Sequence, residues 1–330
     1  MSNRTTAAAV CEVRNLTVHY DVSATPVVAA NEVSFDVYEG ETLGLVGESG
    51  CGKSTTAMAM LRLLQTPGRV AGGSVNIAGV DIMRLRPAAL RDFRWRNIAL
   101  IPQGAMNALN PVMRIEKQLA DAIAAHADTG GRQALRARIG ELLEMVGLPA
   151  DVRRLYPHEL SGGMKQRVCV AMAVALNPPL VIADEPTSAL DVVVQRLVAQ
   201  SLIRIKETLG IAMVLIGHDM GLMAQLTDRV AVMYAGRIME IAPTDVLFKA
   251  PLHPYTQQLI DSVPSIRVKK PLRVFPGGPP DLRNLPPGCP FEPRCPKAIT
   301  ICRGETPALK ACGEKQYAAC HVPNTNRNNI

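Results

Sequence analysis

Short apolar runs alternate with amphipathic segments along this chain of 330 residues. The runs that predict strands lie at 12–19, 28–37, 43–46, 75–77, 98–101, 180–183, 212–216 and 230–234. Helical periodicity marks 55–64, 115–125, 132–146, 163–176 and 192–208, and Gly72-Gly73-Ser74 predicts a turn. Strands that alternate with helices predict an α/β fold with a mostly parallel sheet, buried on both faces.

The pattern changes at two places. Helical periodicity dominates from about residue 106 to 178, which predicts a helical insertion between strands of the core. Residues 266–330 hold eleven of the twenty-five prolines and show little periodicity. We therefore expect two domains, 10–265 and 266–330, with a boundary near Ser265.

Charge follows the same division. The tail, residues 266–330, carries eleven Lys and Arg against four Asp and Glu, and the rest of the chain carries twenty-five of each. A body without net charge argues against a nucleic-acid-binding protein, so no nucleic acid is expected as a partner. The basic tail could face solvent, RNA or anionic lipid. No stretch approaches the ~18 apolar residues of a membrane span, and no signal peptide is evident, so we expect a cytoplasmic protein.

One loop carries a specific chemical signal. The pattern G-x-x-x-x-G-K-[ST] is satisfied by Gly47, Glu48, Ser49, Gly50, Cys51, Gly52, Lys53, Ser54 and Thr55. It follows an apolar strand and precedes a helix, which is the context that a phosphate-binding P-loop requires. Lys53 is expected to reach the β- and γ-phosphates of a nucleotide, and the Ser54 hydroxyl to bind Mg²⁺.

Two further motifs suit nucleotide hydrolysis. The apolar strand 180–183 ends in Asp184 and Glu185, which suit the surroundings of Mg²⁺ and the polarisation of an attacking water. Ser161, Gly162 and Gly163 stand at the start of a predicted helix, where Ser161 can cap and free N–H groups can meet phosphate. Each motif is weak alone, but their order after a P-loop makes chance coincidence a poor explanation.

With Leu160–Arg167 reading LSGGMKQR, the chain resembles the ATP-binding-cassette (ABC) ATPases. The resemblance implies a P-loop NTPase cassette with a RecA-like core, an antiparallel β edge and a helical subdomain at about 106–178, followed by a small Cys/Pro-rich extension. It implies head-to-tail dimers in which the signature Ser161-Gly162-Gly163 meets the partner's ATP. The remaining matches are Gln103 as the Q-loop that senses Mg²⁺, Ser188–Asp191 as the D-loop, His218 as the switch histidine, and Tyr20 as the adenine-stacking ring, for which core packing competes.

Residues 253–259, reading HPYTQQL, with Ser262-Val263-Pro264 and Asn110-Pro111, resemble the oligopeptide and dipeptide importer ATPases of the dipeptide-type D subunit. This implies a second, F-type ATPase, two permeases and an extracytoplasmic peptide-binding protein as partners. It also implies a peripheral location on the cytoplasmic face of the plasma (inner) membrane. Importers of nickel or of other peptide-like cargo remain an alternative, and so does a non-transport ABC ATPase of DNA repair or translation, which the single cassette disfavours.

Five of the eight cysteines lie in the tail. Cys289, Cys295, Cys302 and Cys320 are separated by five, six and seventeen residues, without the C-x-x-C knuckle of an ordinary zinc ribbon. Long Pro-rich loops better suit four thiolates around a cuboidal cluster, and the peptide-importer resemblance also implies a [4Fe–4S] cluster on these four cysteines. Zinc, free thiols and disulfides stay open. Cys312 is expected to be a bystander.

Overall fold

The computed structural model describes residues 8–104, 108–188, 190–262 and 277–324, so the expected boundary near Ser265 lies outside the described residues. The chain divides into two compact units. The first unit comprises Met1–Cys11, Asp36–Glu41 and Asn76–Leu215, and the second comprises Glu12–Phe35, Thr42–Val75 and Ile216–Ile330.

Parallel strands form the centre of the first unit. β6 (Ile98–Ile101) pairs in parallel with β7 (Leu180–Asp184), with Ile98 opposite Leu180. β8 (Ala212–Gly217), most of which belongs to this unit, follows on the other side of β7. Every residue of β7 and β8 is buried, as expected for parallel strands without an alternating pattern.

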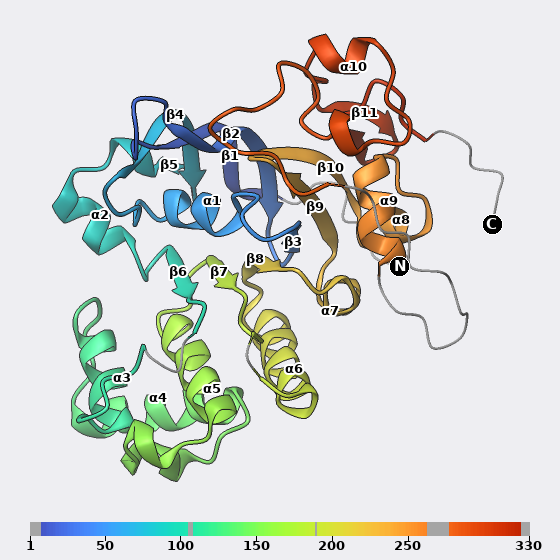
Figure 1. The fold of residues 1–330 in the computed structure, drawn as a ribbon. Coiled ribbons are helices and arrows are strands. Elements are labelled where there is room, and N and C mark those ends of the chain that lie inside the picture. The colour runs from blue at the N-terminus through green and yellow to red at the C-terminus, as the bar shows by residue number, and fades with distance from the viewer. Residues whose placement is uncertain (1–7, 105–107, 189, 263–276, 325–330) are drawn as a thin grey trace. The chain divides into compact units, whose positions relative to one another are not determined.

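Four longer helices of the first unit pack on one another (Figure 1): α3 (Ile115–Ala124), α4 (Arg132–Met145), α5 (Gly162–Ala173) and α6 (Val192–Leu209). The shorter elements are β5 (Val80–Asp81), η1 (Ile82–Arg84), α2 (Pro87–Phe93), η3 (Ala150–Arg154) and η4 (Pro157–Glu159). Glu116 of α3 accepts from Arg136 of α4 and Arg153 of η3, each at 2.7 Å. One carboxylate therefore joins three elements of the helical segment.

The second unit contains a mixed sheet in the order β11-β12-β10-β9-β3. Its strands are β3 (Thr42–Val46), β9 (Arg229–Tyr234), β10 (Arg237–Pro243), β11 (Lys310–Gly313) and β12 (Gln316–Ala318). β3 and β9 are parallel, and the other pairs are antiparallel, with Glu240 opposite Ala318. The Cys/Pro-rich tail thus adds two strands to this sheet, which its sequence pattern did not predict.

A second sheet in this unit takes the order β2-β1-β4, from the parts of β1 (Ala9–Tyr20), β2 (Val27–Tyr38) and β4 (Gly68–Ile77) that belong to it. The helices of the unit are α1 (Lys53–Met60), α7 (Met220–Leu226), α8 (Thr244–Lys249), α9 (Pro254–Asp261), η5 (Glu292–Arg294) and α10 (Ile301–Gly304). No helix within the described residues is both long and apolar enough to span a bilayer.

Two local predictions were wrong. Gly72-Gly73-Ser74 is not a turn but lies inside β4, where Gly73 has φ +90° and a Cβ there would stand 2.5 Å from the Asn15 carbonyl oxygen. The glycine serves a close backbone approach to β1. The helix predicted at 55–64 instead starts at Lys53 and ends at Met60, because Arg62 turns to a left-handed φ of 52°.

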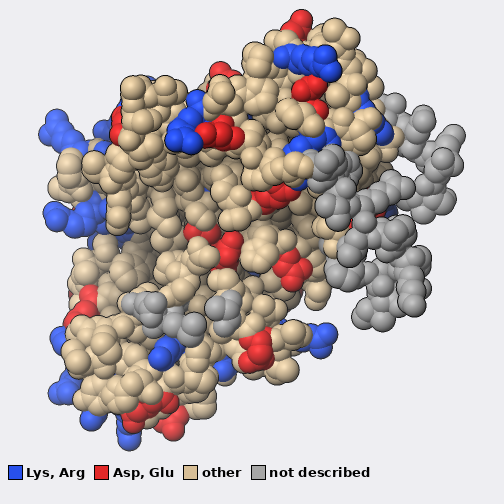
Figure 2. Space-filling model, in the orientation of Figure 1, with Lys and Arg blue, Asp and Glu red and all other residues tan. Residues whose placement is uncertain are grey.

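On the face shown in Figure 2, Lys and Arg side chains are interspersed with Asp and Glu. This mixture agrees with the balance of charges over residues 1–265.

Candidate functional site

The P-loop of the second unit connects the fully buried β3 to α1. Gly47 and Gly52 have φ of 154° and 104°, and a Cβ on either would stand 2.1 Å from a backbone oxygen, of Met233 and Ala29 respectively. Only glycine fits at these two positions. Lys53 is 6% exposed, and its ammonium group donates to the Gly47 and Glu48 carbonyl oxygens at 2.7 and 2.9 Å. The side chain therefore already lies over the loop that it is expected to serve.

Two residues from the C-terminal region also contact this loop. The backbone N–H of Glu48 donates to the Tyr255 hydroxyl at 2.8 Å, and the Glu48 carboxylate accepts from Arg294 at 2.9 and 3.0 Å. Tyr255 lies in the HPYTQQL segment, which family resemblance alone had marked, without any contact to the P-loop being predicted. Nothing in the sequence pointed to Arg294.

In the first unit, the two predicted carboxylates lie at the C-terminal end of β7. Asp184 is its last residue and 2% exposed, and Glu185 comes next with a left-handed φ of 45°. The Gln103 amide donates to the Glu185 carboxylate at 2.9 Å. The structure therefore brings two of the predicted catalytic residues together across 82 positions of sequence. The strained backbone at Glu185 is typical of functional positions.

The signature segment begins α5, also in the first unit. Ser161 is the N-cap, and its hydroxyl accepts from the Met164 N–H at 3.3 Å, as predicted for the cap. Ser161 is exposed, whereas Gly163 is buried. A Cβ on Gly163 would stand 2.2 Å from Cγ1 of Val194 on α6. Gly163 therefore has a packing role within the chain besides any role toward a nucleotide.

The remaining predicted nucleotide residues occupy ends of strands and helices. Asp191 caps α6 by accepting from the Val193 and Val194 N–H groups at 3.0 and 2.9 Å, and Ala189 of the same motif lies outside the described residues. His218 is exposed after β8. Tyr20, half-buried at the end of β1, lies against Gly68 of β4. The ring of Tyr20 thus packs against β4 and is also partly exposed, so both core packing and stacking on adenine stay open.

The four tail cysteines predicted as ligands line one small cavity in the second unit, together with Phe291 and His321. The Cys289 N–H donates to the Cys302 carbonyl oxygen at 2.8 Å, which closes the loop between them. Burial, with a smaller contribution from the neighbouring cysteines, raises the pKa of Cys289 to about 12. Cys312 is not among the lining residues, and its thiol lies 3.4 Å from the Lys310 carbonyl oxygen.

No group of three or more His, Cys, Asp or Glu side chains in the described part of the chain is placed to hold a metal ion. The four cysteines share the wall of this cavity.

Known proteins resemble the chain over almost its whole length. The dipeptide transport ATP-binding protein DppD of Escherichia coli is 40% identical over 318 residues, covering 96% of this chain and 97% of that protein. The oligopeptide transport ATP-binding protein OppD of Salmonella typhimurium is 42% identical over 315 residues, covering 94% and 93%. The chain belongs to the ABC transporter ATP-binding proteins.

Family models and solved structures agree with this assignment. A model described as ABC transporter matches residues 30–188, and one described as oligopeptide/dipeptide transporter, C-terminal region, matches 239–302. The dimeric structure of MJ0796, a bacterial ABC transporter cassette, superposes with a TM-score of 0.64 at 28% identity, covering 71% of this chain and 98% of that one. The expected cassette fold is thereby confirmed, and ATP with Mg²⁺ is the nucleotide that this family implies.

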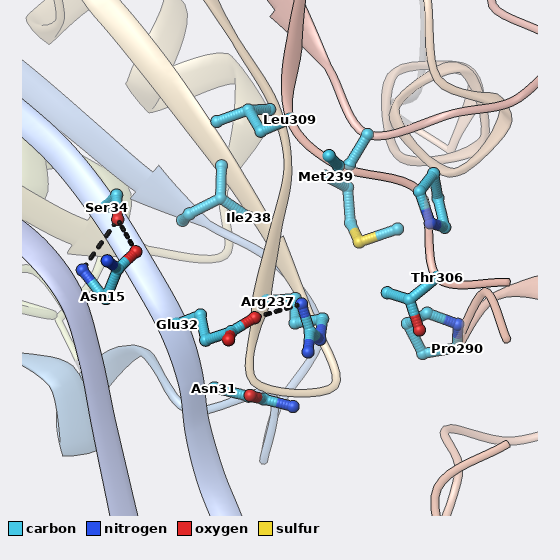
Figure 3. A pocket seen from close by; sticks show the side chains of 13 residues that line it. Asn15, Asn31, Glu32, Ser34, Arg237, Ile238, Met239, Pro290, Thr306 and Leu309 are labelled. Atoms are coloured by element: carbon cyan, nitrogen blue, oxygen red, sulfur yellow. Dashed lines mark hydrogen bonds and ion pairs between the residues drawn. The ribbon is translucent and has the colours of Figure 1, made fainter. Parts of the chain in front are cut away.

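This ABC protein has a larger cavity, of about 310 Å³, in the second unit (Figure 3). It lies between strand residues such as Ser34 and tail residues such as Thr306, and a Glu32–Arg237 ion pair of 3.2 Å crosses its wall. None of the P-loop residues lines it. The cavity is therefore distinct from the phosphate-binding loop.

Proposed function

We propose that this chain is the ATP-hydrolysing subunit of an importer for dipeptides or oligopeptides. The observation that carries the proposal is its 40–42% identity, over nearly the full length, to dipeptide and oligopeptide transport ATP-binding proteins. The match of residues 239–302 to the C-terminal region of such transporters supports the same cargo class. Import of nickel or another peptide-like compound is the alternative that the cassette alone does not exclude.

The proposed assembly places the chain at the cytoplasmic face of the plasma (inner) membrane, beneath two permeases and beside a second, F-type ATPase. An extracytoplasmic binding protein delivers the cargo. Exposure of Ser161 supports the pairing, because a signature that serves the partner's ATP must open to the surface. The cassette would comprise residues 10–265, with its helical subdomain at about 106–178 and the tail as a regulatory or structural extension.

We assign the chemistry of hydrolysis to Glu185. A carboxylate in that position polarises the attacking water, and the 2.9 Å hydrogen bond from Gln103 orients it. Ser54, Gln103 and Asp184 are the proposed Mg²⁺ residues, Lys53 and the loop N–H groups hold the phosphates, and His218 contacts the γ-phosphate. Tyr20 is the proposed adenine-stacking ring.

Glu185→Gln tests this assignment with little change in shape. The variant should lose ATP hydrolysis by at least about a hundredfold while it retains ATP and accumulates as an ATP-bound dimer. Glu141→Gln on α4, where the side chain is 65% exposed, is the matched control and should hydrolyse normally. Turnover retained in Glu185→Gln would remove Glu185 from its role.

Cargo and partners are tested by purification from the native membrane. Two permeases and a second ATPase should accompany the chain, and liposomes bearing the complex should take up a dipeptide but not Ni²⁺ on addition of ATP and the binding protein. Recovery of the chain on DNA or ribosomes, without membrane subunits, would support the non-transport alternative instead.

We also propose a [4Fe–4S] cluster on Cys289, Cys295, Cys302 and Cys320. Four thiols around one cavity supply the soft ligand set that such a cluster needs. The proposal rests on the cavity that these four cysteines share and on the match of residues 239–302 to the C-terminal region of peptide transporters. When bound, the cluster would cross-link a Pro-rich segment that has little core of its own.

Metal analysis after anaerobic purification decides between these groups. About four iron and four acid-labile sulfide per chain are expected, with loss of both in Cys295→Ser and retention in Cys312→Ser. A colourless protein with one zinc would refute the cluster.

A further inference from the structure

Glu48, the second residue of the P-loop, is fixed on three sides. Its carboxylate takes a two-pronged ion pair from Arg294, with distances of 2.9 and 3.0 Å. Its N–H donates to the Tyr255 hydroxyl, and its carbonyl oxygen accepts from Lys53. The backbone and the side chain of this loop residue therefore have specified partners, two of which come from the C-terminal region.

Arg294 is itself held in place. Its side chain is only 8% exposed, and it donates to the Tyr234 hydroxyl at 3.2 Å. The guanidinium lies 5.7 and 5.8 Å from the ring centres of Tyr234 and Phe291, within the range of a cation–π contact. Such a planar, bidentate and stacked arrangement suits arginine and not lysine.

The rings around Arg294 form one buried cluster. Tyr234, Tyr255 and Phe291 are each at most 1% exposed, and their ring centres are 4.7 to 5.4 Å apart. Phe291 belongs to the tail, and Tyr234 ends β9 beside the strand that precedes the P-loop. Because close-packed rings tolerate little displacement, the cluster gives Arg294 a rigid base.

The same short segment also lines the cysteine cavity. Arg294 lies between Cys289 and Cys295, which border the cavity together with Phe291. The tail turn that positions the two thiols therefore also positions the guanidinium that reaches Glu48.

We propose that Arg294 is a positioning residue for the P-loop, so that ATP binding by the cassette depends on the folded tail segment Cys289–Cys295. Arg294 acts through Glu48, which sets the loop conformation and the carbonyl oxygen on which Lys53 rests. The inference goes beyond the proposed function and requires only that the P-loop binds ATP, whatever occupies the cysteine cavity.

The decisive measurement is the Kd of the full chain for a fluorescent ATP analogue. Arg294→Met keeps the length of the side chain and should weaken binding about tenfold, the scale of a charge-assisted hydrogen bond. Glu48→Gln should weaken it in the same direction, and the double variant should be no worse than Arg294→Met, because both changes remove one interaction. Arg283→Met, which breaks an exposed ion pair with Asp281 in the same tail, is the matched control.

A direct action of Arg294 on the phosphates gives a different pattern. Glu48→Gln would then tighten binding by removing a negative charge, and the effects of the two single changes would add. That pattern, or an unchanged Kd in Arg294→Met, would overturn the proposal. A wild-type chain that binds no ATP would contradict the proposed function instead.

Tyr255→Phe keeps the inference testable if Arg294→Met fails to fold. It retains the ring and removes only the hydroxyl that accepts from Glu48. It should raise the KM for ATP several-fold with little change in kcat, because binding and not the chemical step depends on the loop. A fall in thermal stability with an unchanged KM for ATP would show that the Tyr255 hydroxyl only stabilises the fold. That result would refute the role of its contact with the P-loop.

Discussion

Gly163→Ala separates the two roles of the signature glycine. The residue is buried at the start of α5, and an added Cβ would stand 2.2 Å from Cγ1 of Val194 on α6. Carbon atoms in contact prefer about 3.5–4 Å, so α5, α6 or the Val194 side chain must shift by more than about 1 Å. The substitution therefore disturbs packing within the chain before any nucleotide is considered.

The magnitude follows from two opposing terms. Overpacking of this kind costs about 1–3 kcal/mol, and replacing glycine by alanine in a helix returns about 0.5–1 kcal/mol. The difference spans about 0–2.5 kcal/mol, and a loss near its middle should lower the melting temperature by roughly 3–5 °C for a unit of this size. Val194→Ala removes the clashing methyl groups, so Gly163→Ala/Val194→Ala should recover most of that loss relative to Val194→Ala alone.

Thermal unfolding and ATP hydrolysis are then measured on the same four proteins. If the glycine also meets the partner's ATP, the double variant should regain stability but not activity. Full recovery of activity in the double variant would show that Gly163 serves packing alone. A Gly163→Ala protein as stable as the wild type would refute the steric argument itself.

Two further substitutions test the loop and the helical segment. Gly47→Ala should abolish ATP binding, because its Cβ would stand 2.1 Å from the Met233 carbonyl oxygen. Gly50→Ala has open space around it and should cost only the roughly 1–2 kcal/mol of a left-handed φ. Equal losses of ATP affinity in a binding titration would contradict this. Arg136 and Arg153 lower the pKa of Glu116 in the folded chain. The ion pair therefore stabilises the fold at pH values above the ordinary pKa of 4.5, and this stabilisation is lost as the pH falls through the lowered pKa. Glu116→Gln should therefore destabilise the chain by about 1 kcal/mol at pH 7, and the difference should shrink as the pH falls below 4.5. A pH-independent difference in unfolding curves would refute the ion-pair explanation.

Local chemistry made the P-loop, the strand before Asp184 and the cap at Ser161 predictable. Each depends on residues close together in sequence: glycines with required backbone angles, a fully apolar strand, or a hydroxyl three positions from its N–H donor. The parallel strands also followed from unbroken apolar runs. The pattern did not give β11 and β12, because three or four residues are too few to establish a period of two.

Contacts between segments distant in sequence could not be predicted. Arg294 and Glu48 are 246 positions apart, and an arginine between two cysteines has no periodicity or motif that points to a P-loop. The sequence also did not predict the Gln103–Glu185 hydrogen bond, although family resemblance had marked both residues. A pairing of this kind depends on the tertiary fold, which a single sequence does not specify at the level of contacts.

The buried carboxylate of Glu240 bears on whether the tail is a separable domain. Glu240, on β10, is fully buried and accepts from the Leu252 and His253 N–H groups at 2.9 and 2.8 Å and from the Gln316 amide at 3.1 Å. Burial raises the pKa of Glu240, because the charged carboxylate is poorly solvated there. Removing one of its hydrogen-bond donors would therefore destabilise the fold. Truncation near Ser265 would delete Gln316, uncover the edge of β10 and leave Glu48 without Arg294. We therefore expect the truncated cassette to melt at a lower temperature and to bind ATP more weakly than the full chain, whereas an independent appendage would leave both measurements unchanged.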